Sequence, residues 1–249
     1  MMFDLTGQTA LVTGADRGIG AGMAKALAAA GAEIIGASRT IAEDGGDVGR
    51  QIRAMGGAFR AERLDLSDRR DVAAFAERTA PEVDILVANA GTIERAPAEA
   101  MSLDAWDHVF EVNLRGQFAL IQPFGRKMLA AGEGRIIVTA SLLSFQGGIN
   151  VAAYTATKSG LVGMVRALSN EWSGSGVTVN AIAPGYIETE NTRALRDDRA
   201  RSQAILERIP IGRWGDPDDL GGATVFLASP SASYVTGIVL PVDGGWLSR

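Results

Sequence analysis

Tyr154 and Lys158 stand four residues apart, thirteen residues after Ser141. If this segment is helical, the spacing places the phenol and the ammonium on one face, one turn apart. An isolated tyrosine has a pKa of about 10, and a fixed cation beside it favours the phenolate. The pair can therefore serve as a general acid and base near neutral pH, although an ordinary pair on a helix surface has the same spacing.

A glycine-rich segment, Thr13–Gly20, follows the first expected strand and opens the first expected helix. Gly14 permits a tight turn, Gly18 permits the backbone to approach a diphosphate, and Gly20 permits close packing of helix on strand. Free N–H groups and the positive end of the helix dipole favour an anion there. The expected dinucleotide contacts in this turn are Gly14, Asp16, Arg17, Gly18, Ile19 and Gly20.

The end of the second expected strand, Ala37-Ser38-Arg39, indicates which dinucleotide fits. An acid there would bind the adenosine ribose hydroxyls and select NAD, whereas an arginine can pair with the 2′-phosphate of NADP. The chain has Arg39 and no acid at this corner, and Arg17 could reach the same phosphate. Two solvated arginines are the alternative, but the local chemistry modestly favours NADP.

The third and fourth expected strands also end in candidate cofactor contacts. Asp65 can accept a hydrogen bond from the adenine amino group, and Leu66 follows it. Asn89-Ala90-Gly91 supplies small residues where the backbone must pass the cofactor. The expected dinucleotide contacts outside the glycine-rich turn therefore include Ser38, Arg39, Asp65, Leu66, Asn89, Ala90 and Gly91.

Short apolar runs alternate along the chain with longer amphipathic stretches. The expected strands are Thr9–Thr13, Glu33–Ala37, Phe59–Leu64, Ile85–Asn89, Arg135–Ala140, Val177–Ile182 and Ile238–Val242. The expected helices include Gly20–Ala30, Asp71–Thr79, Leu103–Ala131, Ala152–Trp172 and Pro217–Ala228. This alternation predicts an α/β fold: a single doubly wound, Rossmann-type domain over residues 1–249, with a seven-stranded parallel sheet covered by helices on both faces.

A long insert, about residues 184–214, interrupts the alternation before the last expected strand. It contains a helix-like stretch, Arg199–Arg208. Ligands bind at the carboxyl ends of the strands in such sheets, and an insert leaving a strand there is placed to cover a substrate. We therefore expect a substrate lid, with a helix of no such role as the alternative.

Composition narrows the classes of function. The net charge of −5 includes no basic stripe, so nucleic acid is not an expected partner. The sequence has no cysteine and one histidine, His108, which excludes disulfides, thiolate catalysis and the usual cysteine or histidine metal sites. The N-terminal residues show no targeting pattern, and no apolar run reaches the ~20 residues of a membrane span. We expect a cytoplasmic protein without a metal or a membrane partner.

Together these features resemble the short-chain dehydrogenase/reductase family over essentially the whole chain. The residues in the family's order and spacing are Thr13–Gly20, Asn89-Ala90-Gly91, Asn113, Ser141, Tyr154, Lys158 and Pro184-Gly185. The resemblance implies that Tyr154 transfers a proton to or from the substrate oxygen, which Ser141 positions. It further implies that Lys158 lowers the pKa of Tyr154 and holds the nicotinamide ribose, while Asn113 holds a water that links Lys158 to solvent.

Three segments resemble one bacterial branch of this family more closely. They are Ser141–Gly148, Asn180–Tyr186 continuing to Gly212–Gly215, and Val242–Leu247. The branch interconverts a hydroxyl and a ketone on ring-opened sugar acids, of the 2-dehydro-3-deoxy-D-gluconate or 2-deoxy-D-gluconate type, and is usually associated with NAD. The resemblance favours NAD where Arg17 and Arg39 favour NADP, so the expected cofactor is NAD(P).

The resemblance also implies where the nicotinamide and the substrate lie. It places Pro184, Gly185 and Ile187 beside the nicotinamide and Thr189 near the diphosphate. A sugar acid requires a cation for its carboxylate, and the candidate cations are Arg95, Arg193 and Arg213. Further candidate substrate contacts are Ser144, Gln146, Tyr186, Asn191 and, closing the pocket from the same or a neighbouring subunit, Trp246.

Two other functions remain open on the sequence. A broader keto reductase of the same family, of the 3-oxoacyl-carrier reductase or gluconate 5-dehydrogenase type, would suit the glycine-rich turn with Arg17. A non-catalytic sensor of nicotinamide is the more distant alternative, although it would not require the complete set of catalytic residues. Family resemblance also implies a homotetramer.

Overall fold

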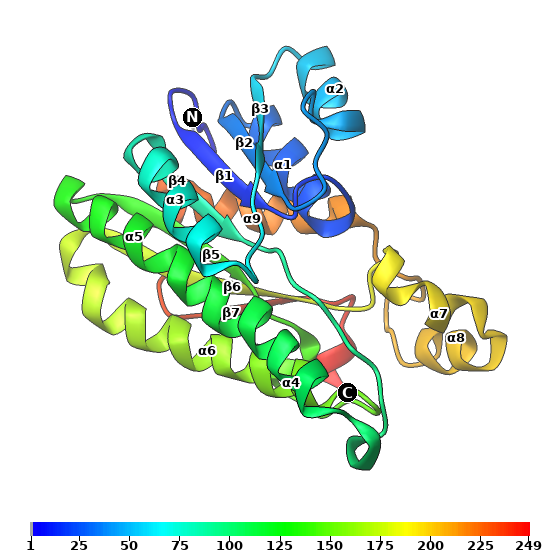
Figure 1. Cartoon of the computed structure of the whole chain (residues 1–249). Helices are drawn as coiled ribbons and strands as arrows, with labels where there is room; N and C mark the ends of the chain where they lie inside the picture. Colours follow the sequence, from blue (N-terminus) through cyan, green and yellow to red (C-terminus); the bar gives the residue numbers. More distant parts are fainter. Residues whose placement is uncertain (1) are drawn as a thin grey trace.

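Seven parallel strands form one sheet in the computed structural model, which describes residues 2–249. The strands are β1 (Thr9–Thr13), β2 (Glu33–Ser38), β3 (Phe59–Arg63), β4 (Ile85–Ala88), β5 (Gly134–Thr139), β6 (Val177–Pro184) and β7 (Val239–Val242). Their order across the sheet is β3-β2-β1-β4-β5-β6-β7 (Figure 1). The expected doubly wound parallel sheet is therefore confirmed, and each strand ends within two residues of the range expected.

The helices alternate with the strands along the chain. They are α1 (Gly18–Ala29), α2 (Gly46–Ala54), α3 (Arg69–Thr79), α4 (Leu103–Phe110), α5 (Gly116–Ala131), α6 (Ala152–Trp172), α7 (Arg193–Asp197), α8 (Arg199–Leu206) and α9 (Gly221–Ala228). Helix α6 has the predicted ends. Helix α2 was not expected, because glycines at its start obscure the spacing at which Val48 and Ile52 are buried.

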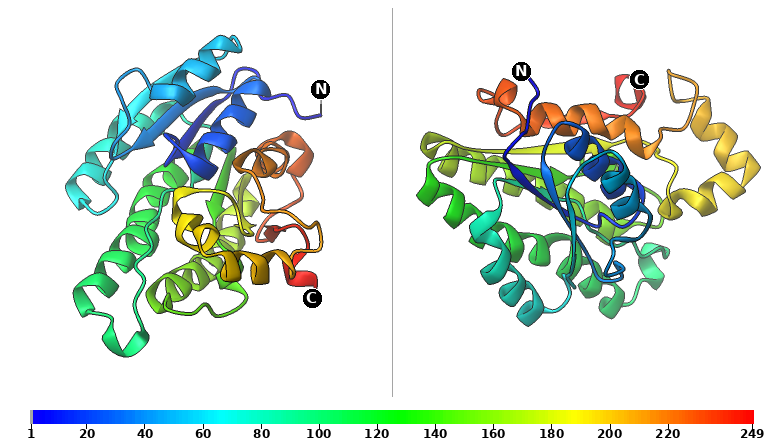
Figure 2. Two further views of the ribbon diagram at one scale, coloured as in Figure 1. Left: turned by 90° about the vertical axis from the view of Figure 1, so that its right-hand side faces the viewer. Right: turned by 90° about the horizontal axis from the view of Figure 1, so that it is seen from above.

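Successive residues of the central strands pack against opposite helix layers. In β1, Leu11 belongs to a core that includes Phe124 of α5 and residues of α3 and α6. Its neighbour Val12 belongs to a second core that includes Leu27 of α1 and residues of α2 and α9. Figure 2 shows the sheet between these two layers. Burial on both faces explains why the strands read as continuous apolar runs.

The order of the strands reverses between β1 and β4, and ligands bind at such a reversal in open α/β sheets. Asn89, directly after β4, ties this edge together. Its side-chain amide donates to the carbonyl oxygen of Thr13 at 2.9 Å, and its side-chain oxygen accepts from the Thr139 hydroxyl at 3.0 Å. The Asn89 side chain thus joins the carboxyl ends of β1, β4 and β5 into one platform.

A π-helical turn, Glu111–Arg115, separates α4 from α5. The sequence predicted one uninterrupted helix over Leu103–Ala131, and the structure differs at this turn. Asn113 lies within it and exchanges two hydrogen bonds with the backbone of Thr92, at 2.7 and 2.8 Å. Such π turns are frequent at functional sites. Here the turn directs the Asn113 side chain toward the carboxyl edge of β4.

The chain that follows β6 leaves the carboxyl edge of the sheet, and α7 and α8 lie away from the main layers (Figure 1). Ile205 and Ile209 attach the segment that contains α7 and α8 to the rest of the protein by packing with Trp214 and Trp246. The C-terminus lies beside α8 (Figure 2, left), where Arg249 donates to the carbonyl oxygen of Glu207 at 3.0 Å.

Candidate active site

A cavity of about 650 Å³ opens at the carboxyl edge of the sheet. Its walls come from the glycine-rich turn, the ends of β2 to β5, the first turns of α6 and residues 188–191. Most of the expected dinucleotide contacts line this one cavity. They are Gly14, Asp16, Arg17, Gly18, Ile19, Gly20, Ser38, Arg39, Asp65, Leu66, Asn89, Ala90, Gly91, Tyr154, Lys158 and Thr189.

The glycine-rich turn forms a cradle that side chains would fill. Gly14 and Gly18 have φ angles of +68° and +53°, in the left-handed region that favours glycine. A Cβ at Gly20 would overlap the carbonyl oxygen of Gly14. Helix α1 begins here without a side-chain cap, so its first N–H groups remain available to an anion. The turn therefore fits a dinucleotide diphosphate.

Helix α6 presents Tyr154 and Lys158 to the opposite end of the cavity. The Nζ atom of Lys158 lies 5.6 Å from the centre of the Tyr154 ring and donates a 2.6 Å hydrogen bond to the carbonyl oxygen of Thr139. Ser141 follows β5 by two residues; its hydroxyl oxygen accepts from the Leu143 N–H at 3.2 Å and is close enough to Tyr154 to favour a lower pKa of that phenol. The predicted trio therefore meets where β5 ends and α6 begins.

Burial is the largest influence on both titrating groups. It raises the pKa of Tyr154, while the hydrogen bond with Ser141 and the charge of Arg95 act in the opposite direction. Burial also lowers the pKa of Lys158 to about 8. The sequence pattern predicted that Lys158 lowers the pKa of Tyr154. The structure shows a different balance, because the Lys158 ammonium is bonded to Thr139 and the tyrosine is desolvated.

Asn113 lies directly behind this trio and is fully buried. Its side-chain amide contacts the Thr157 hydroxyl at 3.4 Å in addition to the backbone of Thr92. A Cβ at Gly91 would lie 3.1 Å from the Asn113 side-chain oxygen and 3.8 Å from the Lys158 Nζ. Asn113 and Lys158 therefore flank the same glycine. Of the four expected catalytic residues, Tyr154 and Lys158 line the cavity, while Asn113 and Ser141 lie beside them without lining it.

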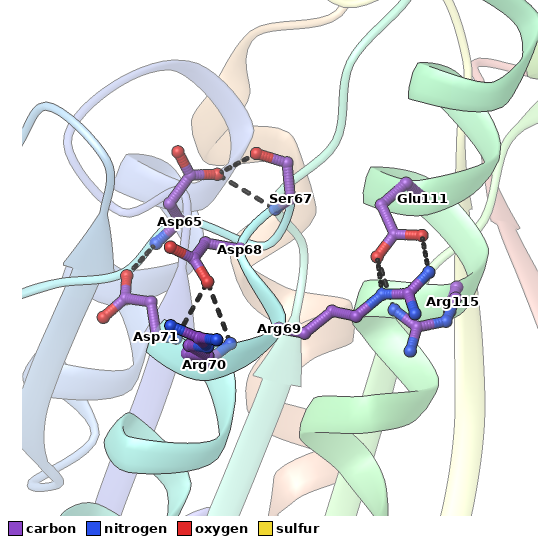
Figure 3. A network of polar contacts seen from close by, with 8 residues as sticks. All are labelled: Asp65, Ser67, Asp68, Arg69, Arg70, Asp71, Glu111 and Arg115. Atoms are coloured by element: carbon purple, nitrogen blue, oxygen red, sulfur yellow. Dashed lines mark hydrogen bonds and ion pairs between the residues drawn. The ribbon is translucent and has the colours of Figure 1, made fainter.

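A polar network supports the wall formed by the β3–α3 turn (Figure 3). The Asp65 carboxylate accepts hydrogen bonds from the N–H and the hydroxyl of Ser67, at 2.9 and 2.6 Å. Burial raises the pKa of Asp65, but these bonds and the charges of Arg39 and Arg63 outweigh it, so the pKa is lowered overall. Asp65 is thus held as a carboxylate facing the cavity.

The same network connects α3 to the π turn (Figure 3). Arg69, at the start of α3, donates to both oxygens of Glu111 at 3.2 and 3.3 Å. Arg115 also bonds to Glu111. Because Glu111 lies two residues before Asn113, these ion pairs join the wall around Asp65 to the segment that carries the buried asparagine.

Comparison with known proteins agrees with this geometry. A family model described as enoyl-(acyl carrier protein) reductase matches residues 14–247. A protein of Pseudoalteromonas atlantica named 2-dehydro-3-deoxy-D-gluconate 5-dehydrogenase is 56% identical over 250 residues, which cover 99% of this chain and 98% of the relative. The chain belongs to the short-chain dehydrogenase/reductase family.

Two solved structures extend the likeness within this family. One, described as a candidate NAD(P)-dependent gluconate 5-dehydrogenase of Beutenbergia cavernae with bound NADP, is 52% identical, covers 100% of each chain and has a TM-score of 0.96. The other, a gluconate 5-dehydrogenase of Burkholderia cenocepacia in complex with NADP and tartrate, is 39% identical with a TM-score of 0.94. It covers 100% of this chain and 98% of its own.

Three residues that the family resemblance placed beside the nicotinamide do not line the large cavity. Pro184 ends β6 in a buried position. Gly185 and Ile187 line a separate cavity of about 180 Å³, together with Tyr186 and Arg213. The backbone that joins them to Thr189 does reach the large cavity, because residues 188–191 form part of its wall.

The three candidate cations for a substrate carboxylate have different surroundings. Arg193 pairs with Glu190 at 3.0 Å. Arg213 forms a bidentate pair with Asp219, at 2.7 and 2.9 Å. Arg95 instead donates to the carbonyl oxygen of Asn191 at 3.0 Å and is close enough to Tyr154 to influence its pKa.

The other candidate substrate contacts separate into two groups. Asn191 lines the large cavity. The Ser144 hydroxyl donates a 2.8 Å hydrogen bond to the backbone carbonyl oxygen of Lys158. Gln146 does not line the cavity. Tyr186 and Trp246 pack together below α8, with ring centres 4.6 Å apart, and Trp246 is 3% exposed. The aromatic pair therefore supports the excursion after β6 and lies outside the large cavity.

Sequence reasoning missed several residues of the cavity wall. They include Thr13, Thr40, Ser67, Thr92, Ile93, His108, Val112, Thr139, Glu188, Glu190 and Pro217. The end of β2 has no acid of its own, as expected, but the fold brings one there from the glycine-rich turn. The Thr40 hydroxyl donates to the Asp16 carboxylate at 3.2 Å, which brings this acid to the end of β2. The sequence carried a signal for this contact: Thr13 pairs with Ala37 in parallel register, and Asp16 and Thr40 each follow this pair by three residues.

Two further properties of the structure concern membrane-spanning helices and metal-binding clusters. Within residues 2–249, no helix combines the length and the apolar character needed to cross a membrane. The same range contains no cluster of three histidine, cysteine or acidic side chains arranged to hold a metal ion.

Proposed function

We propose that this chain is a nicotinamide-dependent oxidoreductase that interconverts a secondary hydroxyl and a ketone on a small sugar acid of the 2-dehydro-3-deoxy-D-gluconate type. The placement of Tyr154 and Lys158 at one end of a cavity, with Ser141 beside Tyr154 and a diphosphate cradle at the other end, carries the proposal. The Pseudoalteromonas relative bears the name of such an enzyme, and the Burkholderia structure contains NADP and a small hydroxy acid.

The catalytic end provides a proton donor beside a fixed hydroxyl. The bound nicotinamide supplies or accepts the hydride. A raised pKa keeps Tyr154 protonated at neutral pH, which is the state that donates a proton to a ketone oxygen. Ser141, held next to Tyr154, would hydrogen-bond the same oxygen and orient it.

Lys158 and Asn113 would resupply the proton. With a pKa of about 8, Lys158 can gain or lose a proton close to neutral pH. Its buried ammonium lies between the Tyr154 ring and the Thr139 carbonyl, next to the Asn113 side chain across Gly91. This arrangement favours proton transfer from solvent past Asn113 to Tyr154, with Lys158 also holding the ribose.

The remaining walls would bind the dinucleotide. Gly14, Gly18 and Gly20 would face the diphosphate, with Thr189 on the opposite side, and Asp65 would accept from the adenine. The residues proposed at the 2′-position are Arg17, Ser38 and Arg39, while those proposed near the nicotinamide are Pro184, Gly185 and Ile187. The cofactor is NAD(P), in keeping with the NADP found in both solved relatives.

Arg95 is the cation best placed for a substrate carboxylate. Arg193 and Arg213 are each paired with an acid, so a substrate would have to compete with Glu190 or Asp219. Arg95 bonds only a backbone carbonyl among the described residues, and its charge reaches Tyr154. A carboxylate at Arg95 would therefore place the rest of a short sugar acid toward the tyrosine hydroxyl.

The proposal includes three broader features of the protein. The segment of about residues 184–214 would be the substrate lid, since its residues 188–191 already form one wall of the cavity. The chain would act as a single domain in the cytoplasm, and family resemblance implies a homotetramer. Light scattering on the purified protein would test the assembly: a mass of four chains supports it, and a monomer contradicts it.

A paired kinetic assay tests the proposed activity. It follows the absorbance of the reduced nicotinamide with 2-dehydro-3-deoxy-D-gluconate, 2-deoxy-D-gluconate and a 3-oxoacyl thioester, each with NAD(H) and NADP(H). Turnover confined to the sugar acids supports the proposal. Turnover of the thioester alone would assign the broader keto reductase function, and cofactor binding without any turnover would assign the sensor.

A further inference from the structure

An acid lies at the corner of the cavity where the adenosine ribose of the proposed cofactor would sit. Asp16 is half-buried in the glycine-rich turn, and its Oδ2 accepts a 3.2 Å hydrogen bond from the Thr40 hydroxyl. Thr40 in turn donates its backbone N–H to the Ser38 side chain at 3.3 Å. Asp16, Ser38 and Thr40 all line the cavity. The carboxylate is therefore anchored at the end of β2.

The charges at this corner are balanced. Arg17 and Arg39 contribute two positive charges, and Asp16 and Asp65 contribute two negative ones. Arg39 lies close enough to Asp65 to lower its pKa. A 2′-phosphate would add a charge of about −1.5 to −2. Because Arg39 already has Asp65 near it, and Asp16 lines the same cavity as Arg17, NADP would gain less binding free energy here than the two arginines alone suggest.

The two acids are anchored at different strand ends. Asp65 belongs to the β3–α3 turn and accepts both hydrogen bonds from Ser67 on its Oδ1, which leaves its Oδ2 without a partner among residues 2–249, whereas Asp16 is tied to the end of β2, where an acid selects NAD. Asp16 is held through Oδ2 only, and its Oδ1 accepts no hydrogen bond from residues 2–249. That oxygen is free to accept from a ribose hydroxyl, which is how an acid selects NAD. The same oxygen would repel a phosphate ester.

We propose that Asp16, anchored by Thr40, determines the cofactor preference by accepting the 2′-hydroxyl of NAD and opposing the 2′-phosphate of NADP, so that the two dinucleotides compete. The inference rests on the proposed function, because it requires the dinucleotide in this cavity. It assigns opposite effects to neighbouring residues: Arg17 and Arg39 favour NADP, and Asp16 favours NAD.

Direct binding of each dinucleotide tests this role. Isothermal titration calorimetry with NAD⁺ or NADP⁺ alone gives both dissociation constants for the wild type, Asp16→Asn, Asp16→Ser and Thr40→Val. Removing one negative charge near a phosphate should tighten NADP⁺ binding by on the order of tenfold, while NAD⁺ binding weakens or stays the same. Thr40→Val should weaken NAD⁺ binding, because the carboxylate loses its anchor.

Glu43→Gln is the matched control. Glu43 is an exposed carboxylate three residues after Thr40 and does not line the cavity. It changes the net charge as Asp16→Asn does but should leave the ratio of the two dissociation constants unchanged. Equal ratios in the wild type and both folded Asp16 variants, or the same shift in Glu43→Gln, would overturn the role of Asp16. Failure of the wild type to bind either dinucleotide would instead overturn the proposed function.

Discussion

The Nζ atom of Lys158 lies 2.6 Å from the carbonyl oxygen of Thr139, across the gap between α6 and the last residue of β5. Both residues are buried, with Lys158 only 3% exposed. A lone hydrogen bond to a neutral carbonyl does not compensate for removing an ammonium from water. This explains why burial lowers the pKa of Lys158 to about 8.

The buried lysine should make stability depend on pH. Folding lowers the pKa of Lys158 from 10.5 to about 8, so the unfolded chain binds more protons between these values. The free energy of unfolding should therefore rise with pH through this window, and the penalty below pH 8 is about 3 kcal/mol. Lys158→Met removes the titration, so the wild type should gain stability relative to this variant between pH 7 and 10.

Denaturant unfolding at several pH values measures this difference. The variant serves as its own control at each pH, because other titrating groups are shared with the wild type. Parallel stability curves for the two proteins across pH 7 to 10 would show that Lys158 has an ordinary pKa in the folded state.

Arg95 should be the arginine on which substrate affinity depends. Loss of a charge-assisted contact to a carboxylate should raise the KM for 2-dehydro-3-deoxy-D-gluconate by about 10- to 100-fold in Arg95→Met. Arg193→Met is the control, since Arg193 is exposed and paired with Glu190. Steady-state kinetics that show the larger effect in Arg193→Met would move the carboxylate site to the lid.

Gly20 should tolerate no side chain. A Cβ there would overlap the carbonyl oxygen of Gly14, so Gly20→Ala should lower the free energy of unfolding by about 1–3 kcal/mol and weaken dinucleotide binding. Gly222→Ala is the matched change, because a Cβ at Gly222 meets no atom within 4 Å. It should leave stability unchanged or raise it by up to about 1 kcal/mol. Thermal and denaturant unfolding distinguish the two, and equal effects would argue against the tight cradle.

Periodicity predicted most of the fold because the strands are buried on both faces. Continuous apolar runs located the central strands, whereas β3 at the sheet edge carries three charged residues and is only partly buried. The amphipathic pattern of Ala152–Trp172 defined α6. The π turn escaped detection because the residues Glu111–Arg115 continue the helical pattern of their neighbours, and the contacts of Asn113 with Thr92 are not visible in the sequence. Helix α2 was not predicted because its glycines leave few apolar residues from which to recognise helical spacing.

The site was predictable where residue type alone fixes the chemistry. The glycine-rich turn was recognisable from its spacing and its place after the first strand, and Ser141, Tyr154 and Lys158 from their resemblance to the family's motif. Contacts between residues far apart in the sequence were harder to predict. Asp16 and Thr40, for example, meet because β1 and β2 pair in parallel register. The pairing of Arg213 with Asp219 likewise depends on how the chain folds after the lid. The sequence therefore identified the reacting groups better than it identified the charged and polar partners that the fold brings next to other site residues.

Tyr154→Phe tests the central claim most directly, because it removes one oxygen and leaves the aromatic ring in place. Two quantities are measured on the same protein: the kcat with 2-dehydro-3-deoxy-D-gluconate and the dissociation constant of the dinucleotide. If Tyr154 is the general acid and base, kcat should fall by about 10²- to 10⁴-fold while dinucleotide affinity stays near that of the wild type. A variant that retains its turnover would contradict the account.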